Sequence, residues 1–313
     1  YAQRFNASGV AVGGEFRVNT TTANAQQYAH VAALSNGGFV VTWQDNNGTD
    51  GSGWGVLAQR YDAGGVAQGS NVVVNTTTNG TQYHDAVAAY TGGYAVAYSA
   101  SSVSGGNGQD IYVKRYDNAG NMVLDETRVS NTGSTTTALP GTQELPAIAA
   151  RADGSLVVVW QDTSANDGSG NGVYLRTIAA NGTQGATTLV NTFTSGSQYE
   201  PDVALLSDGG FVVVWRSDSQ DGSSAGVYAQ RFNAAGAKVG GEFLINESTN
   251  GGQYQPDVTG LSTGGFVVTW YNDNYDVSGT GTTADVYIRE FSNNGTPIDG
   301  QRKLESGSNS VEY

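Results

Sequence analysis

Aspartate, asparagine, serine and glycine are concentrated in four loops, and these residues offer the oxygen ligands that calcium prefers. The clearest loop, 44–53, reads Gln-Asp-Asn-Asn-Gly-Thr-Asp-Gly-Ser-Gly. Calcium takes roughly six to eight oxygens from carboxylates, amides and main-chain carbonyls, and glycine lets the backbone fold around the ion. The sequence therefore predicts a calcium site in each loop, with the carboxylate pairs Asp45 and Asp50, Asp162 and Asp167, Asp218 and Asp221, and Asp273 and Asp276.

The same loops have a purely structural interpretation. Asp and Asn side chains also hydrogen-bond to the backbone of their own turn and form Asx-turns. The corresponding loop at 99–109 contains no aspartate, so the pattern is not present in every unit. Calcium is the one cofactor we predict, turn capping is the alternative at each loop, and we predict no catalytic residue.

Two aromatic residues, Trp54 and Tyr275, interrupt these otherwise polar loops. Aromatic side chains are common in ligand pockets, where a ring stacks on a sugar. We predict that both residues bind a ligand, with packing inside the protein as the alternative role.

Polar residues also recur in a second place, just before a short alanine-rich segment. The recurring glutamines are Gln27, Gln82, Gln143, Gln198 and Gln253. We predict that their amides fasten a turn, and the alternative is a ring of amides in a central channel. Asp85, Asp202 and Asp257 follow shortly after, either as turn caps or as an acidic mouth of that channel. His30 and His84 occupy non-equivalent positions, so we expect no shared histidine site.

The composition excludes several classes of protein. The 313 residues include no cysteine, which excludes disulfides, Cys-zinc sites and iron–sulfur clusters. A net charge of −14 argues against nucleic acid and anionic membranes as partners. No apolar run approaches the roughly 18 residues of a membrane-spanning helix, and no phosphate-binding loop or nucleophile elbow is present. The sequence starts inside a repeat, so we expect a fragment or a processed product.

An internal repeat of about 55 residues must position all of these side chains. The segment Gly-Gly-Phe-Val-Val-Thr-Trp at 37–43 returns with its last aromatic residue at Tyr98, Trp160, Trp215 and Trp270. A second segment, Tyr-Ala-Gln-Arg-Phe, places the repeated arginines Arg4, Arg60, Arg115, Arg176, Arg231 and Arg289. Each unit has four short apolar runs bounded by Gly, Asn, Asp and Ser, which is typical of β-strands. We expect the repeated arginine to bond a neighbouring strand rather than to act in catalysis.

Four strands in each unit predict an all-β fold, a β-propeller of about 55-residue, four-stranded blades. We divide the single repeat domain, 1–313, into a half unit at 1–19, full units at about 20–76, 77–131, 132–191, 192–246 and 247–305, and a tail at 306–313. This division gives five or six blades, closed by strands from both termini. The alternative is that the spare half unit pairs with another molecule, because unpaired strand edges recruit strands.

The repeat, best seen at 209–246, combines Gly-Gly-Phe-Val-Val-x-Trp, Tyr-Ala-Gln-Arg-Phe and Gly-Gly-Glu-Phe-x-x-Asn. It resembles the repeat modules of large secreted bacterial surface proteins, the RTX-type, type I-secreted adhesins. The RTX nonapeptide itself is absent, so its calcium site is not carried over. The resemblance implies an extracellular or bacterial cell-surface location and a non-catalytic, modular role.

We therefore predict a non-enzymatic extracellular module for adhesion or for binding a glycan or a surface protein, stabilised by calcium, in a bacterial surface or biofilm protein. The first alternative is a structural subunit that assembles head to tail into a fibre through its terminal half-blades. The second alternative, a glycan-cleaving propeller enzyme, requires unrepeated acids that converge on one channel, and no such pair is evident in the sequence. We expect no nucleic-acid partner and no insertion into a membrane.

Overall fold

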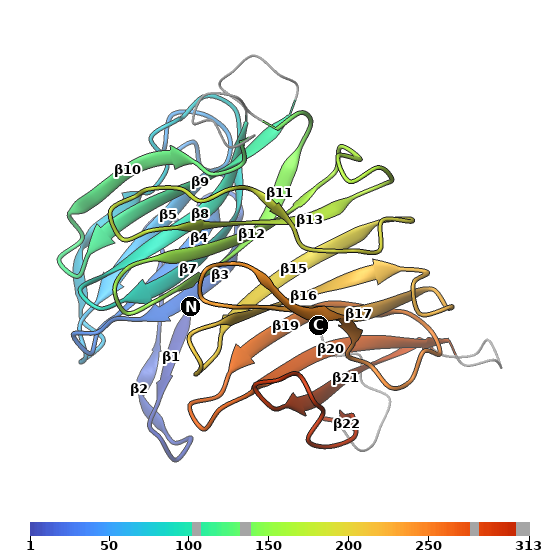
Figure 1. Ribbon diagram of the computed structural model, residues 1–313. Coiled ribbons are helices and arrows are strands. Elements are labelled where there is room, and N and C mark those ends of the chain that lie inside the picture. Colours follow the sequence, from blue (N-terminus) through green and yellow to red (C-terminus); the bar gives the residue numbers. More distant parts are fainter. Residues whose placement is uncertain (102–107, 132–138, 276–281, 305–313) are drawn as a thin grey trace.

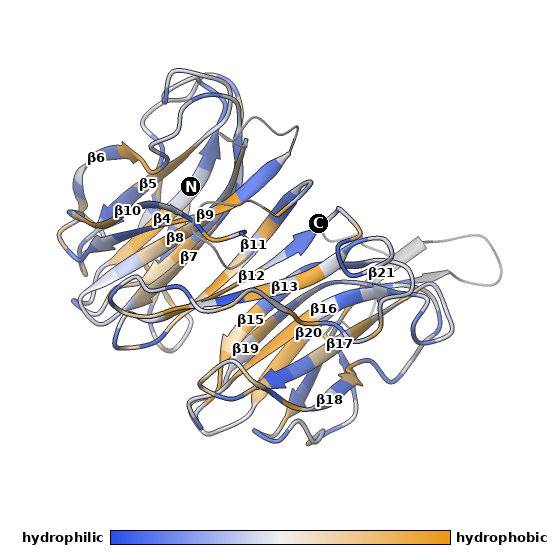
Figure 2. Ribbon diagram, turned by 45° about the horizontal axis from the view of Figure 1, so that its top comes forward, coloured by the Kyte–Doolittle hydropathy of each residue, from blue (hydrophilic) through white to orange (hydrophobic). Residues whose placement is uncertain are grey.

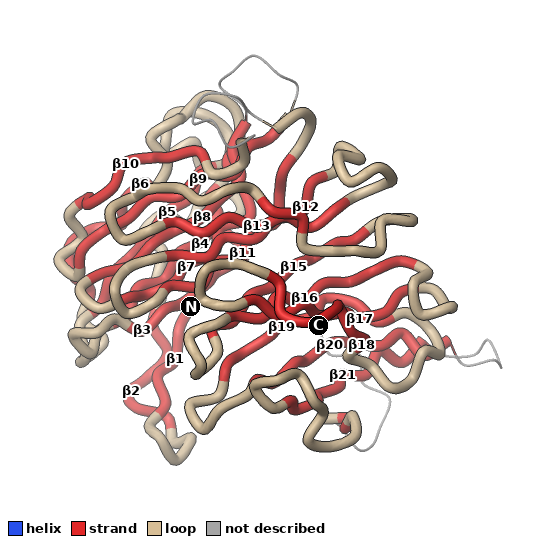
Figure 3. The backbone as a smooth tube through the Cα atoms, viewed as in Figure 1, coloured by secondary structure: helices blue, strands red, loops and turns tan. Residues whose placement is uncertain are grey.

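The computed structural model describes residues 1–101, 108–131, 139–275 and 282–304, and these residues form strands joined by loops (Figures 1 and 3). One sheet has two strands, β1 (Ala2–Phe5) and β2 (Ala11–Phe16). Five sheets have four antiparallel strands each: β3 (Gln26–Ala33), β4 (Phe39–Asp45), β5 (Gly55–Tyr61) and β6 (Ala67–Val73); β7 (Gln82–Tyr90), β8 (Gly93–Ser101), β9 (Gln109–Asp117) and β10 (Met122–Arg128); β11 (Gln143–Ala150), β12 (Leu156–Asp162), β13 (Gly172–Ile178) and β14 (Thr188–Leu189); β15 (Gln198–Leu205), β16 (Phe211–Asp218), β17 (Ala225–Phe232) and β18 (Lys238–Leu244); β19 (Gln253–Gly260), β20 (Phe266–Tyr275), β21 (Thr282–Phe291) and β22 (Arg302–Lys303). The predicted all-β fold is confirmed. No helix among the described residues is long and apolar enough to span a membrane.

The second strand of a sheet that has a neighbouring sheet on either side is apolar on both faces, whereas β20 of the last sheet buries mainly Phe266, Val268 and Trp270 on one face. In β16, Val213 and Trp215 face the sheet β11–β14, whereas Val212 and Val214 face the sheet β19–β22. All four side chains are fully buried. Figure 2 shows this hydrophobic character concentrated on the inner strands. Sheets stacked face to face in this way give a propeller-like arrangement.

A short polar linkage joins each outer strand to the next inner strand. Asn246 accepts a hydrogen bond from Val227 N at 2.8 Å and donates to Gln253 Oε1 at 3.0 Å. Gln253 Nε2 in turn donates to Asn250 O at 3.2 Å. The predicted turn-fastening role of the repeated glutamine is confirmed.

In the first unit this role belongs to Gln26, not to Gln27 as the sequence spacing suggested. Asn19 donates to Gln26 Oε1 at 3.1 Å, and Gln26 Nε2 donates to Ala23 O at 2.7 Å. The adjacent pair Gln26-Gln27 offers two registers to a sequence alignment, and only the backbone geometry distinguishes them.

The repeated arginine links neighbouring sheets, as expected for a structural residue. Arg60 Nη1 donates to Asn118 O at 2.8 Å, and Arg115 Nη1 donates to Ala180 O at 2.6 Å. Each acceptor lies in the turn between the two outer strands of the following sheet. Arg4 of the β1–β2 hairpin makes the same kind of bond to Ala63 O, at 2.7 Å.

The β1–β2 hairpin therefore stands against the sheet β3–β6 in the way that one sheet stands against the next. Val18, just after β2, packs with Trp43 and Tyr61 of that sheet. Among the described residues, β1 and β2 pair only with each other. The predicted closure by a strand from the carboxyl-terminal end falls on residues 305–313, which lie outside the described residues.

Candidate functional site

The first strand of each four-stranded sheet carries a bulge at the same place. Pairing with the second strand slips after the second residue of the strand and resumes three residues later. At the centre of each bulge a non-glycine residue has a left-handed backbone, with φ between 48° and 53°: Tyr28, His84, Leu145, Glu200 and Gln255. This conformation costs a residue with a Cβ about 1–2 kcal/mol. Five such residues at equivalent positions are therefore a feature of the architecture.

The five bulges surround one pocket of about 600 Å³. Its lining draws on β3, β7, β11, β15 and β19, so the first strands of all five sheets converge there. Besides Tyr28, the titratable lining residues are His30, His84, Asp85, Glu200, Asp202 and Asp257. No lysine or arginine of the described chain lines it. We call this space the axial pocket.

Asp202 and Asp257 form an interacting pair of carboxyl groups in the axial pocket. Burial and the nearby charge of Asp257 raise the pKa of Asp202 to about 7, although its Oδ2 accepts a hydrogen bond from Val258 N at 2.7 Å. Burial also raises the pKa of Asp257, and His30 partly offsets this shift. Two carboxylates in one low-dielectric site resist ionising together, so a proton is retained near neutral pH.

Asp85 is the most enclosed carboxylate of the axial pocket, with only 2% of its surface exposed. Neither of its carboxylate oxygens forms a hydrogen bond of ordinary geometry with the described residues, and the same is true of Gln44 Nε2. Burial raises the pKa of Asp85 to about 7, and the nearby Thr42 side chain lowers it only in part. Asp85 is therefore a buried carboxyl group that keeps its proton near neutral pH.

Glutamate and glutamine side chains connect adjacent bulges. Gln161 donates to Glu144 Oε1 at 2.9 Å and accepts a hydrogen bond from Glu200 N at 3.2 Å. Glu200 Oε2 accepts a hydrogen bond from Gln255 N at 2.9 Å. These bonds satisfy backbone groups that the bulges remove from the β-ladder, and they fix the bulges relative to one another.

Aromatic rings stand beside the axial pocket. The ring of Trp54 lies 6.3 Å from that of Tyr83, which in turn lies 5.7 Å from the ring of His84. Arg216 is stacked between Tyr199 and Tyr254, with its guanidinium carbon 4.9 Å and 4.5 Å from the two ring centres. Trp54 thus belongs to the surroundings of the pocket. The side chain of Tyr275 lies outside the described residues.

The loop carboxylates predicted to bind calcium bond mainly to their own turns. Asp45 accepts a hydrogen bond from Asn47 N at 2.9 Å, and Asp162 accepts one from Ser164 N at 2.8 Å. Further acceptors of this kind are Asp50, Asp167 and Asp221, whereas Asp218 pairs with Arg216 and Asp273 accepts from Gly252 N. Asp276 lies outside the described residues. No cluster of three or more His, Cys, Asp or Glu suited to a metal occurs in the described part of the chain, and calcium stays a prediction.

The expectation that the two histidines share no site is wrong. His30 and His84 both line the axial pocket, because slightly different positions of a bulged strand face the same space. Asp85, Asp202 and Asp257 line the same pocket, in agreement with the alternative that these repeated residues form an acidic mouth of a central channel. A signal for the bulges was present in the sequence: Pro146, Pro201 and Pro256 stand inside strands, where proline marks a bulge or an edge.

The sequence matches no family model and no curated protein. Among solved structures, the fold is similar to that of Penicillium chrysogenum alpha-L-arabinanase complexed with arabinobiose, at 14% identity, with 89% of this chain and 93% of that chain covered and a TM-score of 0.55. It is also similar to the GH93 alpha-L-arabinofuranosidase of Fusarium graminearum with arabinobiose, at 15% identity, 89% and 93% coverage and a TM-score of 0.52. The Hadza microbial sialidase Hz136 matches at 12% identity, 90% of this chain and 59% of that chain, with a TM-score of 0.53.

These comparisons support a propeller-like fold and contradict two predictions made from the sequence. We predicted a non-catalytic adhesion or binding module that is not an enzyme. The solved structures of similar fold are glycoside hydrolases, which contradicts both predictions. At identities of 14% and 15% the likeness establishes the fold alone, so an activity must be argued from the residues of this chain. The resemblance to RTX-type repeats stays a prediction.

Proposed function

We propose that this protein hydrolyses a glycosidic bond in the axial pocket. The observation that carries the proposal is the pair Asp202 and Asp257, two interacting carboxyl groups in one pocket, of which Asp202 has a pKa of about 7. Glycoside hydrolysis uses two carboxyl groups of opposite protonation, one as acid and one as base or nucleophile.

Asp202 is the general acid of this proposal. Its raised pKa keeps the carboxyl protonated near neutral pH, and it donates that proton to the glycosidic oxygen as the bond to the anomeric carbon breaks. Asp257 is more exposed than Asp202, and His30 offsets part of the rise in its pKa that burial causes. The Asp257 carboxylate stabilises the positive charge that develops on the sugar and assists the addition of water, which restores the proton to the pair.

The lining of the axial pocket favours a neutral sugar as substrate. Recognition of a sialic or uronic acid calls for an arginine or lysine against the carboxylate, and none lines the pocket among the described residues. The accessible lining side chains Glu200 and Gln255 instead match sugar hydroxyls, which both donate and accept hydrogen bonds. Tyr28 contributes an aromatic ring to the lining.

The proposal includes six blade positions around the axial pocket. Five are the four-stranded sheets, and the β1–β2 hairpin is the outer half of a sixth. The support for this count is the bond from Arg4 to the outer turn of the next sheet, which matches the bonds of Arg60 and Arg115. The extracellular location stays a prediction.

The direct test is to incubate the protein with a panel of neutral and acidic chromogenic glycosides and plant polysaccharides. Hydrolysis is measured as the release of chromophore or of reducing sugar. We expect activity on neutral substrates, and D202N and D257N to reduce kcat by about 100-fold or more, as loss of general acid–base catalysis does. The matched control is D299N, because Asp299 is an exposed carboxylate far along the chain from the pocket-lining strands. Inactivity of the folded wild-type protein on the whole panel, or equal effects of D202N and D299N, would refute the proposal.

A further inference from the structure

Two carboxyl groups of β15 bond to the backbone of β19 on either side of Asp257. Glu200 Oε2 accepts a hydrogen bond from Gln255 N at 2.9 Å, and Asp202 Oδ2 accepts one from Val258 N at 2.7 Å. Asp257 lies between these two donors in the chain. The two bonds therefore hold the segment that carries Asp257 against the strand that carries Asp202. We call them the carboxyl clamp.

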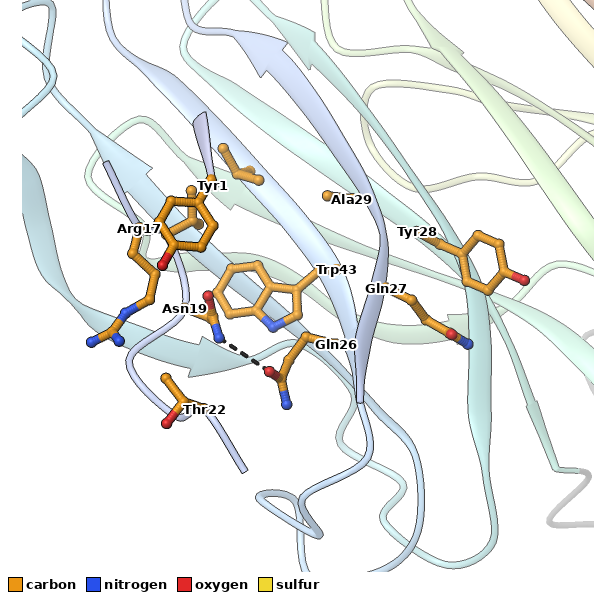
Figure 4. A pocket seen from close by; sticks show the side chains of 11 residues that line it. Tyr1, Arg17, Asn19, Thr22, Gln26, Gln27, Tyr28, Ala29 and Trp43 are labelled. Carbon is orange, nitrogen blue, oxygen red and sulfur yellow. Dashed lines mark hydrogen bonds between the residues drawn. The ribbon is translucent and has the colours of Figure 1, made fainter. Parts of the chain in front are cut away.

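The carboxyl clamp acts where β19 leaves its regular ladder. The start of β19 is fixed by a glutamine linkage of the kind drawn between Asn19 and Gln26 in Figure 4. Pairing with β20 is then interrupted between Tyr254 and Asp257, and Gln255 inside this interruption has a left-handed φ of 48°. Backbone N–H groups that leave a ladder need another acceptor, and the clamp supplies it.

The repeat architecture does not require the carboxyl clamp. In β11 the positions equivalent to Glu200 and Asp202 are Leu145 and Ala147, whose side chains contain no acceptor. The β15 bulge still forms beside β11, and its Glu200 N donates to Gln161 Oε1 from β12 at 3.2 Å. The two carboxyl groups of β15 are thus a departure from the repeat, and this departure coincides with the proposed pair of acids.

We propose that Glu200 is a positioning residue that, through the carboxyl clamp, sets the separation of Asp202 and Asp257. This inference rests on the proposed function, because two acids need a defined separation to act on one glycosidic bond. Loss of the Glu200 acceptor frees the bulge of β19, so that Asp257 moves away from Asp202 and water enters between them.

The first test measures the titration of Asp202 by NMR of labelled aspartate carboxyl carbons, in the absence of substrate. Burial and the charge of Asp257 raise the pKa of Asp202 to about 7 in the intact protein. E200A removes the acceptor, so we expect the pKa to fall by roughly one unit as the acids separate and water enters. E200Q keeps an acceptor oxygen without the charge, so its Asp202 should titrate as in the wild type. Because β11 has Leu145 at this position, loss of the carboxylate is compatible with the fold.

E242A is the matched control. Glu242 is also a half-buried carboxylate that accepts backbone N–H groups, from Thr192 at 2.6 Å and from Phe193 at 3.1 Å. It belongs to β18, which contributes no residue to the lining of the axial pocket, so E242A should leave the titration of Asp202 unchanged. An unchanged pKa of Asp202 in E200A, or an equal fall in E200Q or E242A, would overturn the proposal.

Activity provides the second test and separates this inference from the proposed function. On a substrate that the wild type hydrolyses, E200A should lower kcat by about 10- to 100-fold and E200Q should retain most of it, because small displacements of catalytic groups cost rates of this size. Equal kcat values for E200A and the wild type would contradict the positioning role. A folded wild type that is inactive on every substrate refutes the proposed function, whereas the titration still decides whether the clamp positions the two carboxyl groups.

Discussion

Buried aspartates occur in two regions of this molecule, and their surroundings are opposite. Asp162, at the start of a loop, is fully buried and accepts hydrogen bonds from Ser164 N, Asn166 Nδ2 and Gln143 Nε2 at 2.8, 2.9 and 3.2 Å. Asp85, on an inner strand, is 2% exposed, and neither of its oxygens has such a donor. Burial alone therefore does not determine the role of a carboxyl group. The hydrogen-bond donors around it decide whether it stabilises a turn as a carboxylate or keeps a proton near neutral pH.

The largest expected effect is that of D85N on stability at alkaline pH. The pKa of Asp85 is about 7 in the folded protein and 3.8 as the ordinary value, so the folded state binds a proton between these limits. The contribution of Asp85 to stability is therefore most favourable below about pH 4 and is lost as the pH rises through about 7. Removing the charge should stabilise the protein by up to about 4 kcal/mol at pH 8, and by much less at pH 5. Urea unfolding at the two pH values measures the difference.

D299N, which changes an exposed carboxylate, should show no such dependence on pH. If D85N instead lowers stability equally at both pH values, Asp85 accepts hydrogen bonds like Asp162, and the contrast between the two regions fails.

We expect D162A to lower the free energy of unfolding, which is a smaller change than that of D85N and of opposite sign. The substitution leaves the donors of Ser164, Asn166 and Gln143 without their acceptor, and lost buried hydrogen bonds cost roughly 1–3 kcal/mol. The melting temperature should fall at every pH between 5 and 8. Melting the wild type with and without a calcium chelator tests the predicted ion in the same experiment: a large fall on chelation would show that the loop carboxylates hold calcium in addition to their turns.

The strands of this protein were predictable because their signals are local. Apolar runs such as 39–43 are bounded by turn residues, and the repeat displays each run several times. The turn-fastening glutamines and the repeated arginines were predictable for the same reason, since their partners lie in the next turn or the next repeat unit.

A central channel with Asp85, Asp202 and Asp257 at its mouth was one of two alternatives that the sequence left open, and the sequence could not choose between them because the pocket depends on contacts between distant strands. His30 of β3 and Asp257 of β19 influence each other's pKa although they come from the first and last full units. A bulge also shifts the side-chain alternation of a strand, so repeat spacing alone does not show which of two neighbouring residues faces inward. Sequence spacing therefore placed the chemistry in the Asp-rich loops, where oxygen ligands are adjacent along the chain.

The smallest expected change in the free energy of unfolding concerns the bulges of the first strands, which lie between the Asp-rich loops and the axial pocket. Gln255 has a φ of 48° at the centre of the β19 bulge, and its side chain is exposed. Because glycine adopts this backbone without strain, Q255G should raise the free energy of unfolding by about 1 kcal/mol. S70G is the matched control at an exposed position of β6 with an ordinary backbone, where glycine should lower it by about 0.5–1 kcal/mol. Destabilisation by both substitutions would mean that the bulge is no more strained than an ordinary strand.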